Sequence, residues 1–513
     1  MPETTTPVDA TARPPTQAAQ GPDPRALWPA LQSARRERRD RLLAPVAEVA
    51  GRPAAPRHLT WVGDLQQGDG GKGAMTDRLA AFHHITARVQ GGDNAGHTTV
   101  FQDGRGDTRV LKSHLLPSGL RHPGVFGVIA NGVLVNAETL AHEVAGFRAG
   151  LPPLRGRLLL SDRAHLVLPL HREADGRQEE ERGSAHAIGT TRRGIGPANV
   201  SKANRIGIRV GDLRDPRLLR RRVEQNVRFF GLPRERTDEQ VAWLGHHRDL
   251  LLSLAGDSVL LLRAAADAGY SIVLEGAQGP MLDIEHGVYP YVTTSPTAFY
   301  SVAGGTGLDA AAVDHRIGVL KAYQTMVGNG PFVTEDHGAL GDRLREAGDE
   351  FGTTTSRPRR CGWLDLVHAR WAVELNGYSS VVVTKLDVLD GFDRIGLCVS
   401  YEPAAGGHGE FRPDHAYLGG CAPVYCWLPG WRTPTKGVRR QADLPVEARG
   451  FLRYVADYLG VEVTAAGVGP AEQDIVVTPG GELARLMAPA APGPATQPAA
   501  GGSVPGPRRV AAP

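Results

Sequence analysis

The feature that most limits the possible folds of this chain is a series of short apolar runs, each of which ends in Gly, Asp or Lys. These runs are HLTWVGD, FGVIANG, SIVLEGAQG and SSVVVTKLD, and they lie between residues 58 and 387. Runs of this length that do not alternate with polar residues are typical of strands covered by helices on both faces. We therefore expect an α/β fold with a large, mostly parallel central sheet flanked by helices. The polar ends of the runs would then line the carboxyl edge of the sheet, where open α/β sheets place their ligands.

The two ends of the chain differ in composition from the block between them. Residues 1–57 are rich in Pro, Ala, Thr and Arg, so we expect an arm that is disordered or partly helical. Acids interrupt its basic stretch ARRERRD, which favours a solvated helix face over a nucleic-acid site. Residues 482–513 are dominated by Pro, Ala and Gly, and we expect a disordered tail. Residues 58–481 show no repeat and no Pro-rich linker, which favours one large domain with insertions.

Charge and cysteine content argue against several classes of protein. With 58 basic and 55 acidic residues the net charge is +3, which indicates neither a nucleic-acid partner nor a membrane partner. The four cysteines form no C-x-x-C pair, so a disulfide framework or a zinc site is not expected. The chain has no apolar run of 18 residues, and its N-terminus lacks the apolar segment of a secretion signal. We expect a soluble, cytoplasmic protein.

The segment QQGDGGKGAMTD, residues 66–77, has the composition of a phosphate-binding loop. Its glycines would leave backbone N–H groups free to face oxyanions, Lys72 adds a positive charge, and Asp69 can bind magnesium. The P-loop spacing G-x-x-x-x-G-K-[ST] is nevertheless absent, because Gln66 stands at the first glycine and Gly73 at the Ser or Thr position. The residues alone are also compatible with a glycine turn and a solvated lysine.

The tetrapeptide TKLD, Thr384 to Asp387, directly follows the apolar run SSVVV. Its Asp can accept hydrogen bonds from N1–H and from the 2-amino group of guanine, a pair of donors that adenine lacks. The aliphatic part of Lys385 can cover the face of the base. The alternative is an Asp that caps the next helix. Together with a phosphate-binding loop, the tetrapeptide favours a guanine nucleotide.

Three further polar segments contain groups suited to catalysis or to anion binding. QGGDNAGHTTV, residues 90–100, places His97 among glycines, where an imidazole can donate a proton or bind phosphate, although a single turn histidine is more often structural. IGTTRRGIGP, residues 188–197, and TTTSRPRRCGWLD, residues 353–365, supply arginines that suit carboxylates and phosphates. Both loops could equally be solvated or bind RNA phosphates, but no aromatic residues are interleaved with the arginines to support RNA.

Eight segments, taken in order, closely resemble the adenylosuccinate synthetase family. They are QGDGGKG, QGGDNAGHT, IGTTRRGIGPA, LEGAQGPMLDIEHGVYPYVT, VLKAYQTMVGNGPFVTE, EFGTTTSRPRRCGWLD, TKLDVLDG and VYCWLPGW. The resemblance implies a GTP-dependent ligase of purine biosynthesis that joins IMP to L-aspartate through a 6-phosphoryl-IMP intermediate. It also implies a GTP-binding core like that of P-loop NTPases with insertions, Mg²⁺ as cofactor, and a homodimer.

The resemblance further implies roles for individual residues. Asp69 would be the general base and a magnesium ligand, the carbonyl of Gly96 a second magnesium contact, and His97 the general acid. Lys72 would stabilise the transferring phosphoryl group, and Gln278 would complete the catalytic set and contact IMP. The implied GTP-binding positions are Gly68, Gly70, Gly71, Gly73, Thr98, Arg359, Lys385, Asp387, Gly467 and Gly469. The implied substrate-binding positions are Asn94, Thr191, Thr293, Thr355, Arg357 and, from a second subunit, Arg205.

Several positions around the ligands depart from the family pattern. Gly70 stands where the pattern has Glu, and Ala74 where it has a second Lys, so one positive charge near the phosphate is lost. The other departures include Gln67, Asp93, Arg192, Ser356 and Pro358. They leave open a second hypothesis, a paralogue that performs the same ligation on an IMP analogue. A non-catalytic nucleotide-binding protein is a third hypothesis, which the retained acid, base and lysine positions disfavour.

Overall fold

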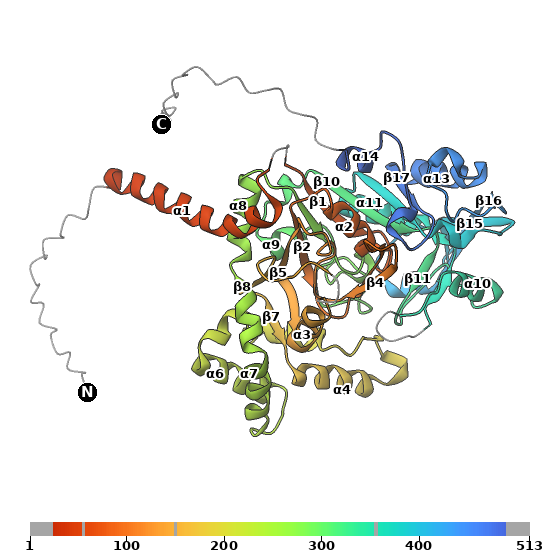
Figure 1. Ribbon diagram of the computed structural model, residues 1–513. Coiled ribbons are helices and arrows are strands. Elements are labelled where there is room, and N and C mark those ends of the chain that lie inside the picture. The colour runs from red at the N-terminus through yellow and green to blue at the C-terminus, as the bar shows by residue number, and fades with distance from the viewer. Residues whose placement is uncertain (1–23, 54–56, 148–150, 353–357, 489–513) are drawn as a thin grey trace, which may run out of the picture.

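The computed structural model describes residues 24–53, 57–147, 151–352 and 358–488, and Figure 1 shows the arrangement of their helices and strands. Within these ranges, eleven strands form one sheet in the order β18-β17-β14-β10-β1-β9-β2-β5-β6-β8, with β7 paired to β5. All pairs are parallel except β17 with β18. The expected α/β fold with a large, mostly parallel sheet is confirmed.

The sheet and the shorter pairings use the following elements. The strands of the large sheet are β1 Leu59–Asp64, β2 Ile85–Gly91, β5 Phe126–Asn136, β6 Leu158–Ser161, β7 His165–Val167, β8 Ala255–Gly256, β9 Ile272–Glu275, β10 His315–Lys321, β14 Ser380–Thr384, β17 Glu462–Gly467 and β18 Ile475–Val477. The remaining strands are β3 His97–Gln102, β4 Thr108–Ser113, β11 Gln324–Met326, β12 Arg360–Gly362, β13 Leu364–Asp365, β15 Arg394–Pro403 and β16 Cys421–Pro429. The helices are α1 Pro24–Ala50, α2 Lys72–Ala80, α3 Ala137–Gly146, α4 Pro169–His186, α5 Ile195–Ala203, α6 Pro216–Phe229, α7 Arg236–Leu254, α8 Ser258–Asp267, α9 Ser301–Thr306, α10 Ala339–Ala347, α11 Leu366–Asn376, α12 His415–Gly419, α13 Val446–Leu459 and α14 Glu482–Leu486.

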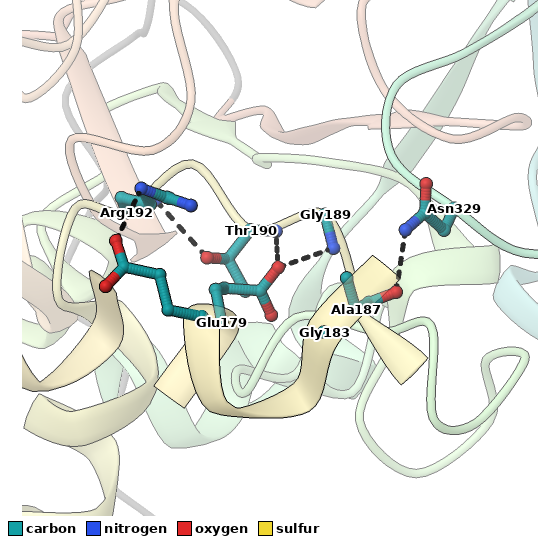
Figure 2. Close-up of a pocket in the computed structure, with 8 residues that line it drawn as sticks. Glu179, Gly183, Ala187, Gly189, Thr190, Arg192 and Asn329 are labelled. Carbon is teal, nitrogen blue, oxygen red and sulfur yellow. Dashed lines mark hydrogen bonds and ion pairs between the residues drawn. The ribbon is translucent and has the colours of Figure 1, made fainter. Parts of the chain in front are cut away.

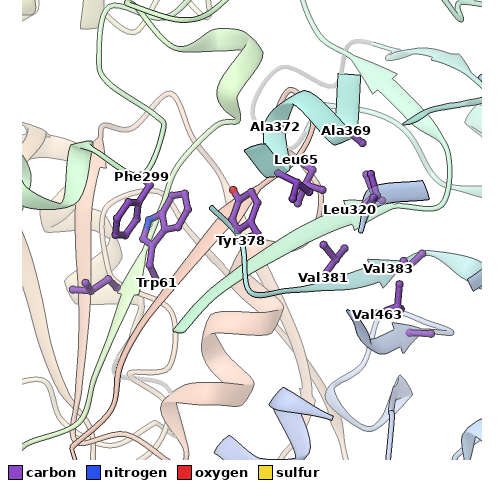
Figure 3. Close-up of a cluster of buried hydrophobic side chains, with 14 of the residues drawn as sticks. Trp61, Leu65, Phe299, Leu320, Ala369, Ala372, Tyr378, Val381, Val383 and Val463 are labelled. Carbon is purple, nitrogen blue, oxygen red and sulfur yellow. The ribbon is translucent and has the colours of Figure 1, made fainter. Parts of the chain in front are cut away.

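The four apolar runs of the sequence become β1, β5, β9 and β14, and every residue of β1 is buried. Trp61 stacks on Tyr378 with ring centroids 5.3 Å apart, as Figure 3 shows. Its neighbour Val62 belongs to a different core cluster, with Met75 and Leu79 of α2. Successive residues of a strand point to opposite faces of the sheet. Both faces of β1 are therefore covered, which is why its sequence does not alternate.

The first helix joins the N-terminal arm to the main body. α1 extends from the body in Figure 1, and residues 32–41 on it are exposed. Near its C-terminal end, Leu43 is 8% exposed and Val46 fully buried, and both belong to the largest core cluster together with Leu261 and Leu262 of α8. The last two turns of α1 are thus part of the folded body, while residues 32–41 are solvated.

The expected start of the disordered tail at residue 482 is wrong by a few positions. Residues 482–486 form α14, in which Leu483 is fully buried and Leu486 is 6% exposed, beside Met75 and Leu79. Two leucines spaced by three positions give this short segment an apolar face that the Pro and Ala content of the tail obscures. Residues 489–513 lie outside the described part of the chain. No helix in the described ranges is long and apolar enough to cross a bilayer.

Candidate active site

The glycine-rich loop crosses the carboxyl edge of the sheet between the end of β1 at Asp64 and the start of α2 at Lys72. Gly68, Asp69 and Gly71 have φ angles of 96°, 57° and 99°. This left-handed region favours glycine and is tolerated by Asp, so the loop can turn sharply three times within four residues. These turns allow a loop of seven residues, 65–71, to connect the end of β1 to the N-terminus of α2.

Asp64 lies beneath this loop with its side chain fully buried. One carboxylate oxygen accepts hydrogen bonds from the backbone N–H groups of Gln66 at 2.8 Å and Gly68 at 3.2 Å. The other accepts from the N–H of Gly70 at 3.2 Å and from Nζ of Lys72 at 2.9 Å. From the sequence, we expect the N–H groups of Gly68 and Gly70 to be free for a phosphate. Instead, they donate to a carboxylate of the chain itself.

The departure at Gly70 has a physical reason in this arrangement. A Cβ atom at position 70 would lie 2.6 Å from Oδ2 of Asp64, closer than side chains approach one another. At the next position, Gly71 is the N-cap of α2, and no side chain of the described residues caps this helix. The first N–H groups of a helix lack intrahelical partners and attract anions. The backbone donors that remain available to an anion thus lie at the start of α2 rather than in the middle of the loop.

His97 lies against this helix start. A Cβ atom on Gly73 would come within 2.6 Å of Cβ of His97, and the charge of Lys72 contributes to lowering the pKa of the imidazole. Nδ1 of His97 is 2.6 Å from Oε1 of Glu275, the last residue of β9, whose second oxygen accepts from the backbone N–H of Ser118 at 3.1 Å. The first turn of α2 therefore brings together the lysine and the histidine singled out in the sequence.

The carboxylate of Glu275 fixes the orientation of the His97 ring. Burial would raise the pKa of Glu275, but His97 and Arg88 outweigh it and lower that pKa to about 2. Burial lowers the pKa of His97, and Glu275 opposes that shift. An ionised Glu275 accepts a hydrogen bond from Nδ1–H of His97 and so fixes the orientation of the ring.

Asp69 is paired with an arginine from a distant segment. Its Oδ2 atom lies 3.1 Å from Nη2 of Arg359, and the Asp69 side chain is 35% exposed. Nη1 of the same guanidinium lies 2.5 Å from Oε2 of Glu350. Arg359 is buried between the two acids, so a residue implied to bind GTP contacts the implied base.

Two amide side chains near the loop have buried atoms for which the described part of the chain offers no partner. Both amide atoms of Gln278 and Oδ1 of Asn94 lack a hydrogen-bond partner among the described residues. A Cβ on Gly68 would lie 3.2 Å from Cα of Gln278, and one on Gly91 would lie 3.4 Å from its Oε1. Buried polar atoms are nearly always satisfied in native proteins, so these amides point to a ligand between the loop, the 90–97 turn and Gln278.

The loop before α5 is bound to α4, and Figure 2 shows Glu179 of this helix next to Gly189 and Thr190. Glu179 accepts hydrogen bonds from the N–H groups of Gly189 at 2.9 Å and Thr190 at 3.2 Å. Asp175, one turn earlier on α4, accepts from the hydroxyl of Thr190 at 2.9 Å and from the N–H of Gly194 at 2.8 Å. These two carboxylates fix the backbone on both sides of Thr191, so that residue is presented in one conformation.

The charged departures Asp93 and Arg192 do not pair with each other. Arg192 reaches Glu180 at 3.3 Å on the surface, whereas Arg193 lies 3.8 Å from Oδ2 of the buried Asp93. The same oxygen of Asp93 accepts from Nδ2 of Asn136 at 2.9 Å, at the N-cap of α3. The carboxylate of Asp93 therefore interacts with the N-terminus of α3 and with Arg193, not with Arg192.

The guanine-binding candidates lie beside the phosphate loop. The hydroxyl of Thr384 donates to the carbonyl of Gly70 at 2.7 Å, and a Cβ on Gly467 would lie 3.3 Å from Cα of Thr384. Oδ1 of Asp387 is buried without a partner among the described residues, and burial raises the pKa of this carboxyl. Nζ of Lys385 lies 2.9 Å from Oε1 of Glu350. Parallel pairing of β14 with β17 thus joins segments some 80 positions apart.

The remaining predicted residues are placed as follows. Thr98 follows His97 in β3 and lies opposite Lys112. Gly96 lies in the turn directly before His97. The N–H of Thr293 donates to Leu282 at 2.9 Å, and the next residue, Thr294, accepts a hydrogen bond from α5. Arg205 is exposed just after α5, and a Cβ on Gly469 would lie 2.5 Å from Asp474. Thr355 and Arg357 lie outside the described residues.

Comparison with known proteins identifies this arrangement. Residues 62–476 match the family model described as adenylosuccinate synthetase. The adenylosuccinate synthetase of Moorella thermoacetica is 43% identical over 424 residues, which cover 80% of this chain and 97% of that protein. The chain belongs to the adenylosuccinate synthetase family. The family resemblance of the eight motifs is thereby confirmed.

Solved structures agree with this assignment. A fully ligated adenylosuccinate synthetase from Plasmodium falciparum shares 32% identity and a TM-score of 0.77, and the match covers 82% of this chain and 100% of that chain. A cyanophage S-2L succinoaminodeoxyadenylate synthetase, bound to dGMP and dATP, shares the fold at 22% identity and a TM-score of 0.53, covering 82% and 96% of the two chains. As a member of the family, the chain is a GTP-dependent, C–N bond-forming ligase that joins IMP to L-aspartate.

Several carboxylates that hold the synthetase site in place received no role in the sequence analysis, although Glu275 and Glu350 each lie within one of the eight motifs. They are Asp64, Asp175, Glu179, Glu275 and Glu350. Asp64 and Glu275 each end an otherwise apolar strand, and an acid in that position is the one signal that could indicate them. Asp175 and Glu179 lie in polar surroundings of the sequence, where nothing distinguishes them from solvated acids. Glu350 begins the motif EFGTTTSRPRRCGWLD, in which only the threonines and arginines were assigned roles.

Glu275→Gln is expected to lower kcat of the synthetase by about 10- to 100-fold, the usual effect of losing a partner that orients a reactive side chain. The amide keeps the volume of the carboxylate but removes the charge that orients His97. Steady-state kinetics should show the loss in kcat with KM for aspartate nearly unchanged. Glu285→Gln, an exposed acid in the following turn, is the control. A folded Glu275→Gln variant with normal kcat would contradict the orienting role.

Proposed function

We propose that the ligation takes place in one site at the carboxyl edge of the sheet, between the loop of residues 65–73, the turn of residues 90–97 and Gln278. The observation that supports this most directly is that Lys72 and His97 meet at the first turn of α2. Beside them lie buried amide groups that have no partner in the ranges the structure describes. The catalytic domain of the proposal comprises residues 58–481 with α14 packed against it.

In the first half of the proposed reaction, O6 of IMP attacks the γ-phosphorus of GTP. Asp69 takes the N1 proton, the bond to the β,γ-bridging oxygen breaks, and GDP leaves. Lys72 and His97 stabilise the negative charge that develops on the transferring group, which is the main contribution a protein makes to phosphoryl transfer. In the second half, the amine of aspartate attacks C6, loses a proton, and displaces phosphate.

Mg²⁺ fits the residues that are present. The described residues contain no group of three or more His, Cys, Asp or Glu side chains placed to hold a metal ion. Asp69, partly exposed, and the carbonyl of Gly96 offer two oxygen ligands. Mg²⁺ commonly binds one or two protein oxygens together with substrate phosphates and water. Bound there, it would neutralise charge on the phosphates of GTP.

The proposal places guanine at Asp387, which has a buried carboxylate oxygen without a partner among the described residues. Asp387→Asn is expected to lower the preference for GTP over inosine triphosphate by about 10- to 100-fold, because a charged hydrogen bond to the 2-amino group is lost. The new amide N–H should in turn favour the 2-oxo group of xanthosine triphosphate. Competition assays with the three nucleotides measure this. If the variant kept its full preference for GTP, guanine would have to bind at residues other than Asp387.

The proposal also includes a homodimer in which Arg205 completes the partner's IMP site. Arg205 is exposed with a φ of 64°, and its backbone carbonyl accepts from Arg222 at 2.5 Å, which fixes the turn that carries it. Mixing Asp69→Ala and Arg205→Ala subunits should restore about a quarter of the wild-type activity, because each hybrid dimer then has one intact site. Subunit exchange without recovery of activity would argue against the shared site.

The proposed function is tested by incubating the protein with IMP, L-aspartate, GTP and Mg²⁺ and identifying products by mass. We expect adenylosuccinate, GDP and phosphate, with phosphate release dependent on both IMP and aspartate. Release without them would indicate a simple GTPase, and product formation only from a deoxy or ring-altered IMP would indicate the paralogue. The proposal keeps the cytoplasmic location expected from the sequence.

A further inference from the structure

Glu350 is a fully buried carboxylate on which four donors converge, three residues after the end of α10. Oε1 accepts from Nζ of Lys321 and Nζ of Lys385, each at 2.9 Å, and from the hydroxyl of Tyr323. Oε2 accepts from Nη1 of Arg359 at 2.5 Å. Burial would raise the pKa of Glu350, but the three cations outweigh burial and lower it. Glu350 is therefore an ionised acid whose two oxygens are both in use.

Two of these partners reach the proposed site in different directions. Arg359 contacts Asp69, the proposed base, through Nη2 at 3.1 Å. Lys385 is two positions before Asp387, the proposed guanine contact. The other two partners, Lys321 and Tyr323, are fully buried and hold Glu350 from the side of the sheet. The carboxylate of Glu350 thus fixes both Arg359, which contacts the proposed general base, and Lys385, which lies near the proposed guanine contact.

The charges of this cluster explain why an acid is needed at position 350. Arg359 shares its guanidinium between Asp69 and Glu350, so that Asp69 holds only part of it. Without Glu350, Asp69 would be the one carboxylate of the described residues left in contact with Arg359. An Asp69 held more tightly by Arg359 is less able to reach a proton on IMP or a phosphate-bound cation. Lys385 would at the same time lose the anion that fixes its ammonium group.

We propose that Glu350 is a positioning residue for the ligation, which sets Asp69 through Arg359 and the guanine contact through Lys385. This inference rests on the proposed function of the same site. Glu350 thereby couples the binding of GTP to the position of the general base Asp69, without contacting GTP or IMP itself. Loss of the carboxylate should therefore change two kinetic parameters at once, kcat and KM for GTP, and leave KM for IMP unchanged.

Glu350→Gln is expected to lower kcat and to raise KM for GTP, each by about 10- to 100-fold, the range for one charge-assisted hydrogen bond. KM for IMP should stay within about threefold. Because this change leaves Lys321 buried without its acid, the double variant Lys321→Met/Glu350→Gln is made alongside and should show the same kinetics. Tyr323→Phe is the control, since it removes a hydrogen bond to the same oxygen without touching either link to the site.

A double-mutant cycle tests the link itself. Lys385→Met should raise KM for GTP in the wild-type protein but add little in Glu350→Gln, because the two changes remove one interaction. Additive effects, wild-type kinetics in a folded Glu350 variant, or an equal loss in Tyr323→Phe would each overturn the inference. Failure of both Glu350 variants to fold would assign the carboxylate a structural role and overturn it as well. A wild-type protein that forms no adenylosuccinate would instead refute the proposed function.

Discussion

Replacing Asp69 with Ala is expected to lower kcat for adenylosuccinate formation by at least about 10³-fold, because the substitution removes the base and a proposed cation ligand together. GTP should still bind, since the contacts at Lys385, Asp387 and the start of α2 do not involve this side chain. The fold should also persist. Asp69 is 35% exposed, and its partner Arg359 keeps Glu350 after the substitution. Stopped assays of product and equilibrium binding of GTP measure the two effects separately.

The matched control for this variant is Asp249→Ala, which removes a 98% exposed carboxylate from α7. It should leave kcat within about twofold, as is usual for surface substitutions. Retention of substantial turnover by Asp69→Ala would assign proton removal to another group. Loss of GTP binding together with turnover would show that the loop, rather than the base alone, depends on this residue.

Lys72→Met is expected to lower both activity and stability. The lysine would no longer stabilise charge on the transferring phosphoryl group, which should reduce kcat by about 10³-fold. Asp64 would be left fully buried without its cation, and breaking a buried pair costs about 3–5 kcal/mol. Product formation and urea unfolding, measured on the same sample, give the two quantities.

A double variant separates these two consequences of losing Lys72. Asp64→Asn/Lys72→Met removes both charges, so part of the lost stability should return, because the amide can still accept from two of the loop N–H groups. Activity should stay low, since no cation faces the phosphate. Recovery of kcat along with stability would mean that Lys72 serves only to hold the loop, and that phosphoryl transfer relies on other donors.

The sheet, and the gathering of polar strand ends at one edge of it, can be predicted from the sequence because both depend on local patterns. Trp61 and Val62 enter different cores, and this two-sided burial produces a run without alternation that is visible in a single strand. The sites at Lys72 and Asp387 follow such runs directly, so knowing that the strands are parallel is enough to expect them at one edge. Their mutual placement, through the bond from Thr384 to Gly70, agrees with that expectation.

The groups that hold the site could not be predicted in this way. Glu275 meets His97 across 178 positions, and the pairing depends on β9 lying next to β2 in the sheet. The sequence also leaves Arg192 and Arg193 indistinguishable as partners of Asp93. The turn before α5 directs one toward Glu180 at the surface and the other toward Asp93. Such choices depend on the direction of single side chains, which composition and spacing do not specify.

The crowding between Asp64 and position 70 makes the two positions interdependent. With Asp64 in its place, a Cβ atom at position 70 would lie 2.6 Å from its Oδ2 atom, so a side chain there requires the carboxylate to move. That movement would weaken the hydrogen bonds by which Asp64 holds the backbone of Gln66 and Gly68 and the ammonium group of Lys72. We therefore expect a larger residue at position 70 to be tolerated best when position 64 changes with it.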